Sequence, residues 1–299
     1  MNDEGSGKQY RAGMPPEGSL PLMPGSPGPE PEEEYPNMPV EPVEIKTITV
    51  LPGKAKDGSR ELFAEIAIRA GDLVSIVGPT GSGKTAFIND IEVFSSGDTV
   101  TGRTVLVNGE VPPDEMVRDP AKKPIALITQ NTKCLADLTV QEFLEMHVKA
   151  RKIADDSRME KTIGLANRFT GEKINGTMRM TSLSGGQTRS LLIADAITVS
   201  SAPIILLDEV ESGGIFKDTV ISSLKENNKA VIFVTHDPVL ALLSDRRIVM
   251  RNGAVEKVLE PDGREKEFLS RMTWMDSEIS RVREKIRAGE LIEDEVQGQ

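Results

Sequence analysis

Cysteine is almost absent from this sequence, and histidine is scarce. Cys134 is the single cysteine, and His147 and His236 are the two histidines in a chain of 299 residues. One cysteine cannot build an internal disulfide framework or a zinc cluster held by thiolates, so both kinds of scaffold are excluded. This cysteine usage also suits a reducing compartment.

Long apolar runs and an excess of basic charge are missing as well. No apolar stretch approaches the roughly 18 residues needed to cross a bilayer, and the opening MNDEGSGKQY lacks the basic and apolar regions of a secretion signal. We therefore expect a cytoplasmic protein without direct membrane insertion. The 47 acidic residues outnumber the 36 basic ones, and the net charge of -11 argues against a broad face for nucleic acid.

The composition divides the chain into three segments. Residues 1–43 contain ten of the nineteen prolines and an acidic run at 32–34, so they cannot bury enough apolar surface to offset the entropy of ordering. We predict a disordered tail there, which serves either as a solvated linker or as a docking segment for a partner. Residues 44–260 are predicted to form the main domain, and residues 261–299 a helical extension.

Two kinds of strand are predicted in the main domain. The runs EIKTITVL, ELFAEIAI and RTVLVNGEV are short and rich in β-branched residues, which favours an antiparallel layer. The runs DLVSIVG, KPIALIT, PIILLD and AVIFVT are almost continuously apolar, as expected for parallel strands buried on both faces and separated by helices. Asn252 and Gly253 between two later runs predict a hairpin turn. The fold class is therefore α/β, with a mainly parallel core sheet flanked by helices.

The first candidate site is the glycine-rich stretch GPTGSGKT, which follows a buried run and precedes the helical pattern AFINDIEVF. Its glycines allow backbone N–H groups to face a phosphate chain, and the start of the following helix adds a positive dipole. Lys84 supplies a charge for the β- and γ-phosphates, and Thr85 offers a hydroxyl to Mg²⁺. The predicted nucleotide-binding residues are Gly78, Pro79, Thr80, Gly81, Ser82, Gly83, Lys84 and Thr85.

Carboxylates and a histidine follow two further buried runs. Asp208 and Glu209 end the run IILLDE, where they would emerge at the sheet edge at which the glycine-rich stretch opens. Asp208 is placed to hold the shell of Mg²⁺, and Glu209 to polarise an attacking water. The plain alternative is that both acidic residues only form a turn. His236 lies just beyond the run AVIFVT, a position at which a lone histidine is more often structural than catalytic.

These motifs, with Gln130 at the end of IALITQ and LSGGQ at residues 183–187, stand in the order found in ATP-binding-cassette ATPases. The sequence resembles that family from about residue 44 to about residue 258. The resemblance implies a P-loop NTPase fold with an antiparallel β subdomain and a small helical arm at about 135–190. It also implies that Gln130 serves catalysis and the metal, and that His236 senses the γ-phosphate. Lys84 and Glu209 complete the implied catalytic set.

The stretch LSGGQ forms a second candidate anion site. It opens a helical pattern, so a hydroxyl, free N–H groups and a helix N-terminus come together at Ser184, Gly185, Gly186 and Gln187. One γ-phosphate cannot easily use both this site and Lys84 within one compact domain. The resemblance implies that LSGGQ of one copy closes over ATP bound at Lys84 of a second copy or a homologous subunit. The result would be a head-to-tail dimer that hydrolysis releases.

Two departures from the family pattern stand out. The family's short loop after the catalytic glutamate usually ends in an aspartate that crosses the dimer, whereas residues 210–216 read VESGGIF. Either the loop is longer and Asp218 takes that role, or the coupling between the two sites differs. The aromatic side chain that the family usually places under adenine is missing around Val50 and Leu51. Stacking worth about 1 kcal/mol would then be replaced by apolar contact, and we expect loose base selectivity.

Two helical patterns carry apolar stripes. In the arm, Leu138, Phe143, Met146 and Val148 are expected either to pack within the arm or to face a partner, and His147 is expected to be a surface or partner-facing residue. In the extension, steps of four and three residues define a heptad pattern. This helix either folds back on its own domain or binds a second copy or another partner. The apolar residues of the heptad pattern are Phe268, Met272, Met275, Ile279, Val282 and Ile286.

Two classes of function fit this Mg-dependent ATPase, with ATP and Mg²⁺ as its cofactors. The first is the nucleotide-binding subunit of a transporter whose membrane-spanning subunits are separate chains, which would place it peripherally at the inner face of the membrane. The second is a soluble machine that remodels or activates a cytosolic protein or cofactor complex. An ATP-dependent clamp with little turnover is a third possibility.

Overall fold

The computed structural model describes residues 45–119, 122–129, 132, 137–155, 157–200, 202–209 and 215–292. The predicted tail at 1–43 and the loop at 210–214 therefore lie outside the described residues, and so does Gln130. The chain divides into two compact units, residues 1–41 and residues 42–299, and all the elements described below belong to the second unit.

A small antiparallel sheet stands near the start of this unit, as predicted. It consists of β1 (Thr47–Leu51), β2 (Ile66–Arg69) and β4 (Thr104–Val107), in the order β2-β1-β4. Ile48 pairs with Ile68 on one side and with Val107 on the other. Only the end of the run ELFAEIAI enters the sheet, because Glu61 at its start turns inward to accept hydrogen bonds from Gly53 and Arg103.

The larger sheet has six strands in the order β5-β6-β7-β3-β8-β9. The first five are parallel and β9 is antiparallel to β8, so the predicted mainly parallel core sheet is confirmed. Asn252 and Gly253 form the turn between the last two strands with φ angles of 50° and 82°, which suits the predicted hairpin. The strands are β3 (Leu73–Val77), β5 (Ile125–Thr129), β6 (Ile204–Asp208), β7 (Ala230–Val234), β8 (Arg246–Arg251) and β9 (Ala254–Leu259).

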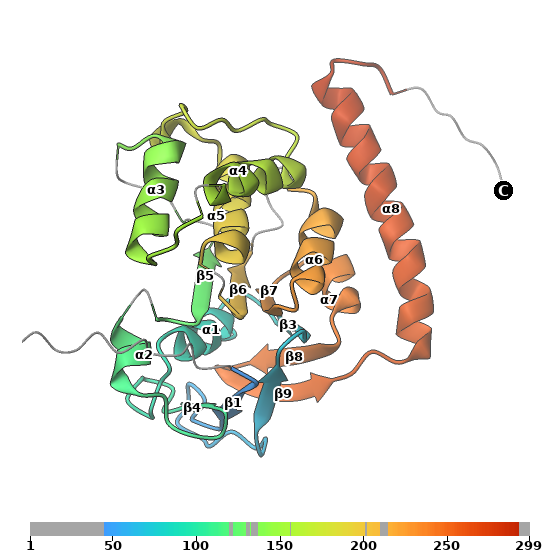
Figure 1. Ribbon diagram of the computed structural model, residues 1–299. Helices are drawn as coiled ribbons and strands as arrows, with labels where there is room; N and C mark the ends of the chain where they lie inside the picture. The colour runs from blue at the N-terminus through green and yellow to red at the C-terminus, as the bar shows by residue number, and fades with distance from the viewer. Residues whose placement is uncertain are drawn as a thin grey trace, which may run out of the picture. The chain divides into compact units, whose positions relative to one another are not determined.

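Helices cover both faces of the larger sheet (Figure 1). Helices α3, α4 and α5 group together on one side of Figure 1, where the family resemblance predicts the helical arm. A 3-10 turn at Met180–Ser182 precedes α5. The helices are α1 (Lys84–Glu92), α2 (Asp114–Arg118), α3 (Val140–Ala150), α4 (Arg158–Phe169), α5 (Gly185–Thr198), α6 (Lys217–Glu226), α7 (Pro238–Leu243) and α8 (Gly263–Arg287).

Successive strand residues enter two different cores, because side chains of a strand alternate between its faces. Leu206 packs with α1 and the antiparallel sheet, whereas Leu207 packs with α5, α6 and the arm. Each fully buried aliphatic side chain of this kind contributes roughly 1.5–3 kcal/mol of transfer free energy. The two cores pack on opposite faces of the larger sheet and hold its parallel strands in place, so that the carboxyl ends of these strands lie at one edge.

In α3 the apolar stripe differs from the predicted one. Val140, Phe143, Leu144 and Val148 are buried, whereas Met146 is 49% exposed. Met146 therefore does not pack within the arm, because the buried stripe begins at Val140, and its alternative role of facing a partner stays a prediction. Thr139 is the N-cap and forms a capping box with Glu142, so the helix starts at Val140.

Helix α8 differs from the others because none of its residues is buried. Its first half lies against α7 and is held by ion pairs between Arg247 and Glu265, 2.7 Å apart, and between Lys217 and Asp276, 3.5 Å apart. Across the described part of the chain, no helix combines the length and apolar content that crossing a membrane requires.

Candidate nucleotide-binding site

The phosphate loop, residues 78–85, leads from β3 into the first turn of α1. Gly78, Gly81 and Gly83 have φ angles of 151°, 76° and 102°, which other residues rarely adopt. A Cβ atom on Gly83 would stand 2.8 Å from the Cα atom of Gly253, whereas the space at Gly81 is open. The loop is therefore packed tightly on one side and free on the other, as a cradle for a phosphate chain requires.

Lys84 is buried in the first turn of α1, and its ammonium group bends over the loop. Its Nζ donates hydrogen bonds to the carbonyl oxygens of Gly78 at 2.9 Å and of Pro79 at 3.3 Å. The hydroxyl of Ser82 is buried and has no hydrogen-bond partner among the described residues, and Thr85 is exposed. The loop thus holds one positive charge and hydroxyl groups whose bonding capacity suits phosphate oxygens.

The turn between β8 and β9 supports the phosphate loop from outside. The backbone N–H of Gly253 donates to the carbonyl oxygen of Ser82 at 2.8 Å. Lys56 joins both parts, because its backbone N–H donates to the carbonyl oxygen of Asn252 at 2.9 Å and its Nζ to that of Gly81 at 2.6 Å. Sequence reasoning missed Lys56, which follows the stretch around Val50 and Leu51 where the family's aromatic residue was expected.

The parallel strands end together beside the phosphate loop. Asp208 pairs with Thr129 on one side and with Val234 on the other, and Val234 pairs with Ile76 in the strand that leads into the loop. Asp208 therefore reaches the same sheet edge as the loop, as predicted. Gln130 directly follows Thr129 but lies outside the described residues, so its predicted role stays a prediction.

Glu209 and His236 lie next to each other at this edge. Their Oε1 and Nε2 atoms are 3.5 Å apart, and both side chains are roughly half exposed. The backbone of Glu209 has a φ of 51°, a left-handed conformation that is costly for a residue other than glycine. Its N–H donates to the carbonyl oxygen of Val234 at 2.9 Å, which holds that conformation. This left-handed backbone conformation at Glu209 places its carboxylate next to His236.

The signature segment, residues 183–187, caps α5. Ser184 is the N-cap, and it forms a capping box with Gln187 in which each side chain bonds the backbone N–H of the other residue. Ser184 and Gly185 are exposed, whereas Gly186 and Gln187 are buried. The Oγ of Ser184 also donates a hydrogen bond of 2.9 Å to the carboxylate of Glu172. The predicted second anion site is therefore accessible, and an acidic residue stands beside it.

These groups fit Mg-ATP. Backbone N–H groups of a helix N-terminus, an ammonium and hydroxyls suit a triphosphate, and the open space at Gly81 leaves room for it. Thr85 and Asp208 are oxygen donors of the kind that Mg²⁺ prefers.

Comparison with known proteins decides the family. The model of the ABC transporter family matches residues 64–212. The uncharacterized ABC transporter ATP-binding protein MJ0121 of Methanocaldococcus jannaschii is 48% identical over 253 residues, which cover 85% of this chain and 97% of that protein. The chain belongs to the ABC transporter family. It is an ATPase of the cassette type, as the order of its motifs predicted.

More distant relatives of this cassette include named import and transport proteins. The lactose transport ATP-binding protein LacK of Rhizobium radiobacter is 31% identical over 68% of this chain and 56% of that protein. The thiamine import ATP-binding protein ThiQ of Brucella suis is 28% identical over 66% of this chain and 82% of that protein.

Solved structures confirm the fold of the cassette. A dimeric post-hydrolysis state of the ATP-binding cassette MJ0796 with ADP and Pi has a TM-score of 0.57 and 24% identity, over 72% of this chain and 99% of that one. The ADP conformation of the cassette MJ1267 has a TM-score of 0.54 and 22% identity, over 76% and 95% of the two chains.

A buried ion network ties the phosphate loop to the rest of the cassette. Arg103 is fully buried and pairs with Glu61 at 2.7 Å and with Asp90 of α1 at 3.0 Å. It also donates to the carbonyl oxygen of Gly253 at 2.7 Å. Sequence reasoning missed this network, because its members come from four separate parts of the chain and form no local motif.

His147, expected as a surface or partner-facing residue, is only partly exposed and has partners within the arm. Its Nδ1 lies 3.0 Å from a carboxylate oxygen of Asp195 in α5, its ring packs against Phe143, and its side chain is 27% exposed. The pair therefore links α3 to the helix that carries the signature segment. The imidazole can lie partly buried beside apolar residues because its ring packs on Phe143 and its Nδ1 faces the carboxylate of Asp195.

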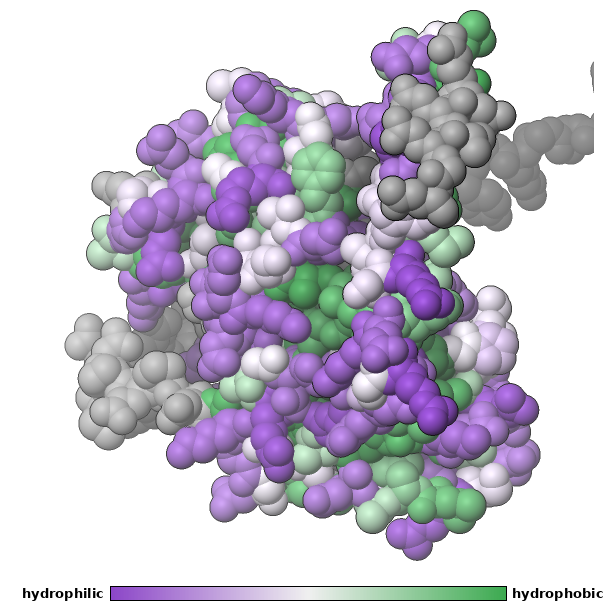
Figure 2. Space-filling view, turned by 90° about the vertical axis from the view of Figure 1, so that its right-hand side faces the viewer, coloured by the Kyte–Doolittle hydropathy of each residue, from purple (hydrophilic) through white to green (hydrophobic). Residues whose placement is uncertain are grey.

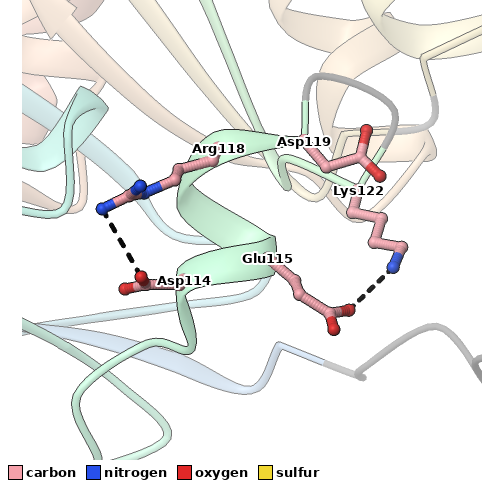
Figure 3. Close-up of a pocket in the computed structure, with 5 residues that line it drawn as sticks. All are labelled: Asp114, Glu115, Arg118, Asp119 and Lys122. Atoms are coloured by element: carbon pink, nitrogen blue, oxygen red, sulfur yellow. Dashed lines mark hydrogen bonds and ion pairs between the residues drawn. The ribbon is translucent and has the colours of Figure 1, made fainter. Parts of the chain in front are cut away.

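A shallow hollow beside α2 does not extend the site. Asp114 pairs with Arg118 at 3.5 Å and Glu115 with Lys122 at 2.7 Å, and Asp119 completes its rim (Figure 3). Both pairs are largely exposed and mutually neutralised, so they present no converging charge to a ligand.

Proposed function

We propose that this cassette is the nucleotide-binding subunit of an ABC transporter and works at the cytoplasmic face of the membrane. Two copies, or one copy and a homologous subunit, enclose ATP head to tail. The observation that carries this proposal is that the phosphate-binding groups belong to two different parts of the fold. Lys84, Glu209 and His236 share the sheet edge, whereas Ser184 bonds to Glu172 and Gln187 in the arm and signature segment.

Each described residue has one role in this proposal. Lys84 and the N–H groups of the phosphate loop bind the phosphates, and Ser184 of the opposite copy donates to the γ-phosphate. Glu209 accepts a proton from the attacking water or orients it, while His236 holds Glu209 and contacts the γ-phosphate. Mg²⁺, when bound, would neutralise phosphate charge, with Thr85 and Asp208 as the residues to hold it.

The helical arm transmits the change to the partner. The signature segment caps α5, which belongs to the arm. When this segment binds the ATP held by the opposite copy, the arm moves with it as a rigid body. The relatives LacK and ThiQ are named for lactose transport and thiamine import, two unrelated cargoes. Their shared cassette supports transport as the work done, and it leaves the choice of cargo to other subunits.

A trapped complex tests this function. Glu209→Gln keeps the size of the side chain and its hydrogen bonds but removes the base, so ATP stays bound and the closed dimer accumulates with its partner. Affinity purification of this variant with ATP from native membranes should recover integral membrane proteins. Lys84→Ala, which cannot bind the phosphates, is the matched control. Recovery of a soluble complex in their place would replace transport with remodelling of a cytosolic assembly.

A further inference from the structure

The apolar seam of α8 is only partly covered within its own chain. Phe268 lines a hollow with Ala241 and Leu242 of α7, and Met272 and Val282 are half-buried. Successive residues of an α-helix are about 100° apart, so side chains spaced by four and three residues form one stripe along it. In this stripe Phe268 is 50% exposed, Met275 and Ile279 are each 49% exposed, and Ile286 is 61% exposed. The complete seam is Phe268, Met272, Met275, Ile279, Val282 and Ile286.

The helix is anchored by ion pairs on one side of the seam. Glu265 and Asp276, which pair with Arg247 and Lys217, point about 70° away from the mean direction of the seam. Figure 2 shows the side of the molecule that carries α8, where apolar surface lies among charged side chains. Helix α8 is thus held along one side of the seam, while Met275, Ile279 and Ile286 stay exposed.

The charges beside the seam identify that partner. In the heptad frame Met272, Ile279 and Ile286 occupy position a, and Phe268, Met275 and Val282 occupy position d. In a parallel pair of such helices, each g residue faces the e residue five positions later in the other helix. Within α8, Arg271 then faces Asp276 and Glu278 faces Arg283, so the two contacts between charged residues join opposite charges, while Arg264 faces Leu269.

We propose that α8 pairs with α8 of a second copy of this chain as a parallel two-stranded coiled coil. An antiparallel pair with the same apolar layers would join like charges, with Arg271 against Lys285 and Glu278 against its own equivalent. The exposed carboxylates do not prevent the parallel pairs, because Asp276 is 36% and Glu278 38% exposed in their present ion pairs. A two-fold axis along the helices is the symmetry of a homodimer.

This association goes beyond the proposed function because it needs no nucleotide. A coiled coil of fewer than about three heptads is weak by itself. Joined to the cassette, it keeps two copies near each other after hydrolysis opens the ATP sandwich, and so raises their effective concentration for the next closure. The coiled coil therefore acts as a tether between turnovers.

Light scattering of the full chain without nucleotide tests the tether. The wild type should form a concentration-dependent dimer, and Ile279→Asp should raise its dissociation constant by more than about tenfold. Trp274→Asp is the matched control, because Trp274 is 66% exposed at a position outside the seam, and it should leave the dimer unchanged. A wild type that is monomeric at high concentration, or equal effects of both substitutions, would overturn the proposal.

Charge exchange tests the parallel orientation. Glu278→Arg and Arg283→Glu should each weaken the homodimer, because each sets like charges against each other. Mixed in equal amounts, the two variants should restore a dimer, because both g–e contacts then join opposite charges. In a Cys134→Ser background, Ile286→Cys should form a disulfide between copies on mild oxidation. Failure of both restoration and cross-linking would contradict a parallel pair, and the substitutions in α8 touch none of the residues assigned to the ATP site.

Discussion

At the scale of single residues, Glu172 places a negative charge beside the exposed hydroxyl of Ser184. We predict that Glu172→Gln lowers the KM for ATP about threefold, because a repulsion with the γ-phosphate is removed while the amide oxygen still accepts the hydroxyl proton. The ATP dependence of phosphate release measures this, and the effect should shrink as salt rises. Glu160→Gln on the surface of α4 is the control, and an unchanged KM in both variants would contradict the prediction.

Lys56 is the second residue with a testable role, because its Nζ holds the carbonyl oxygen of Gly81 at 2.6 Å. Lys56→Met keeps the aliphatic stem but loses this bond and a positive charge, so nucleotide affinity should fall about three- to tenfold. ATP and GTP should weaken equally, because Lys56 contacts the loop and not the base. Fluorescent nucleotide titration measures both. Lys54→Met, a neighbouring exposed lysine, should bind normally, and a selective loss of ATP binding would show that Lys56 reads the base.

The sequence alone predicts the residues of the site where they form local motifs. Gly78 to Lys84 are recognisable because a phosphate cradle needs glycine backbone and one cation within a few residues. Lys56 and Glu172 escape such reasoning, since tertiary packing brings them beside Gly81 and Ser184 from elsewhere in the chain. The cross-dimer aspartate stays a prediction: Asp218 lies in the first turn of α6, and the loop before it is outside the described residues.

At the scale of elements, the network around Arg103 joins the antiparallel sheet, α1 and the β8–β9 turn. Arg103→Ala leaves two carboxylates buried without their cation, so we expect a loss of about 3–5 kcal/mol in the free energy of unfolding. Arg118→Ala removes an ion pair whose side chains are 81% and 85% exposed and should change stability by less than about 0.5 kcal/mol. Urea denaturation of both variants measures the difference, and similar losses would contradict a structural role for the network.

The same network makes stability depend on pH. Burial raises the pKa of Glu61, but hydrogen bonds from Arg103, Gly53 and Val255 outweigh it, so the pKa lies below its usual value of 4.5. Because the folded-state pKa is the lower one, ionised Glu61 stabilises the fold above pH 4.5, and this contribution is lost as pH falls through the folded-state pKa. Urea unfolding between pH 7 and 3 should therefore show a steeper loss of stability for the wild type than for Glu61→Gln. Equal slopes would show that Glu61 is not responsible.

Elements were predictable where one periodicity dominated. The parallel strands appear as apolar runs because both of their faces are covered, and Leu206 and Leu207 in different cores show why no polar residue interrupts them. The prediction failed where a single buried charge outweighed the pattern, as at Glu61. A buried ion pair of this kind cannot be predicted from hydrophobic spacing.

At the scale of the whole molecule, the trans arrangement of the ATP site can be separated from a site contained in one chain. Lys84→Ala disables the phosphate loop, and Ser184→Arg places a bulky cation at the signature segment. Each variant alone should be inactive. A mixed dimer of the two has one intact site, built from the loop of one copy and the signature segment of the other, so an equal mixture should recover about a quarter of wild-type turnover.

The pairing of Lys84→Ala with Glu209→Gln is the decisive control for this recovery. Glu209 ends β6 at the same sheet edge as the phosphate loop of its own chain, so the intact loop in the mixed dimer is served by the substituted glutamine. This mixture should therefore stay inactive although its dimers form equally well. Recovery in both mixtures would mean that Glu209 also acts across the dimer, and recovery in neither would place Ser184 outside the ATP site of the opposite copy.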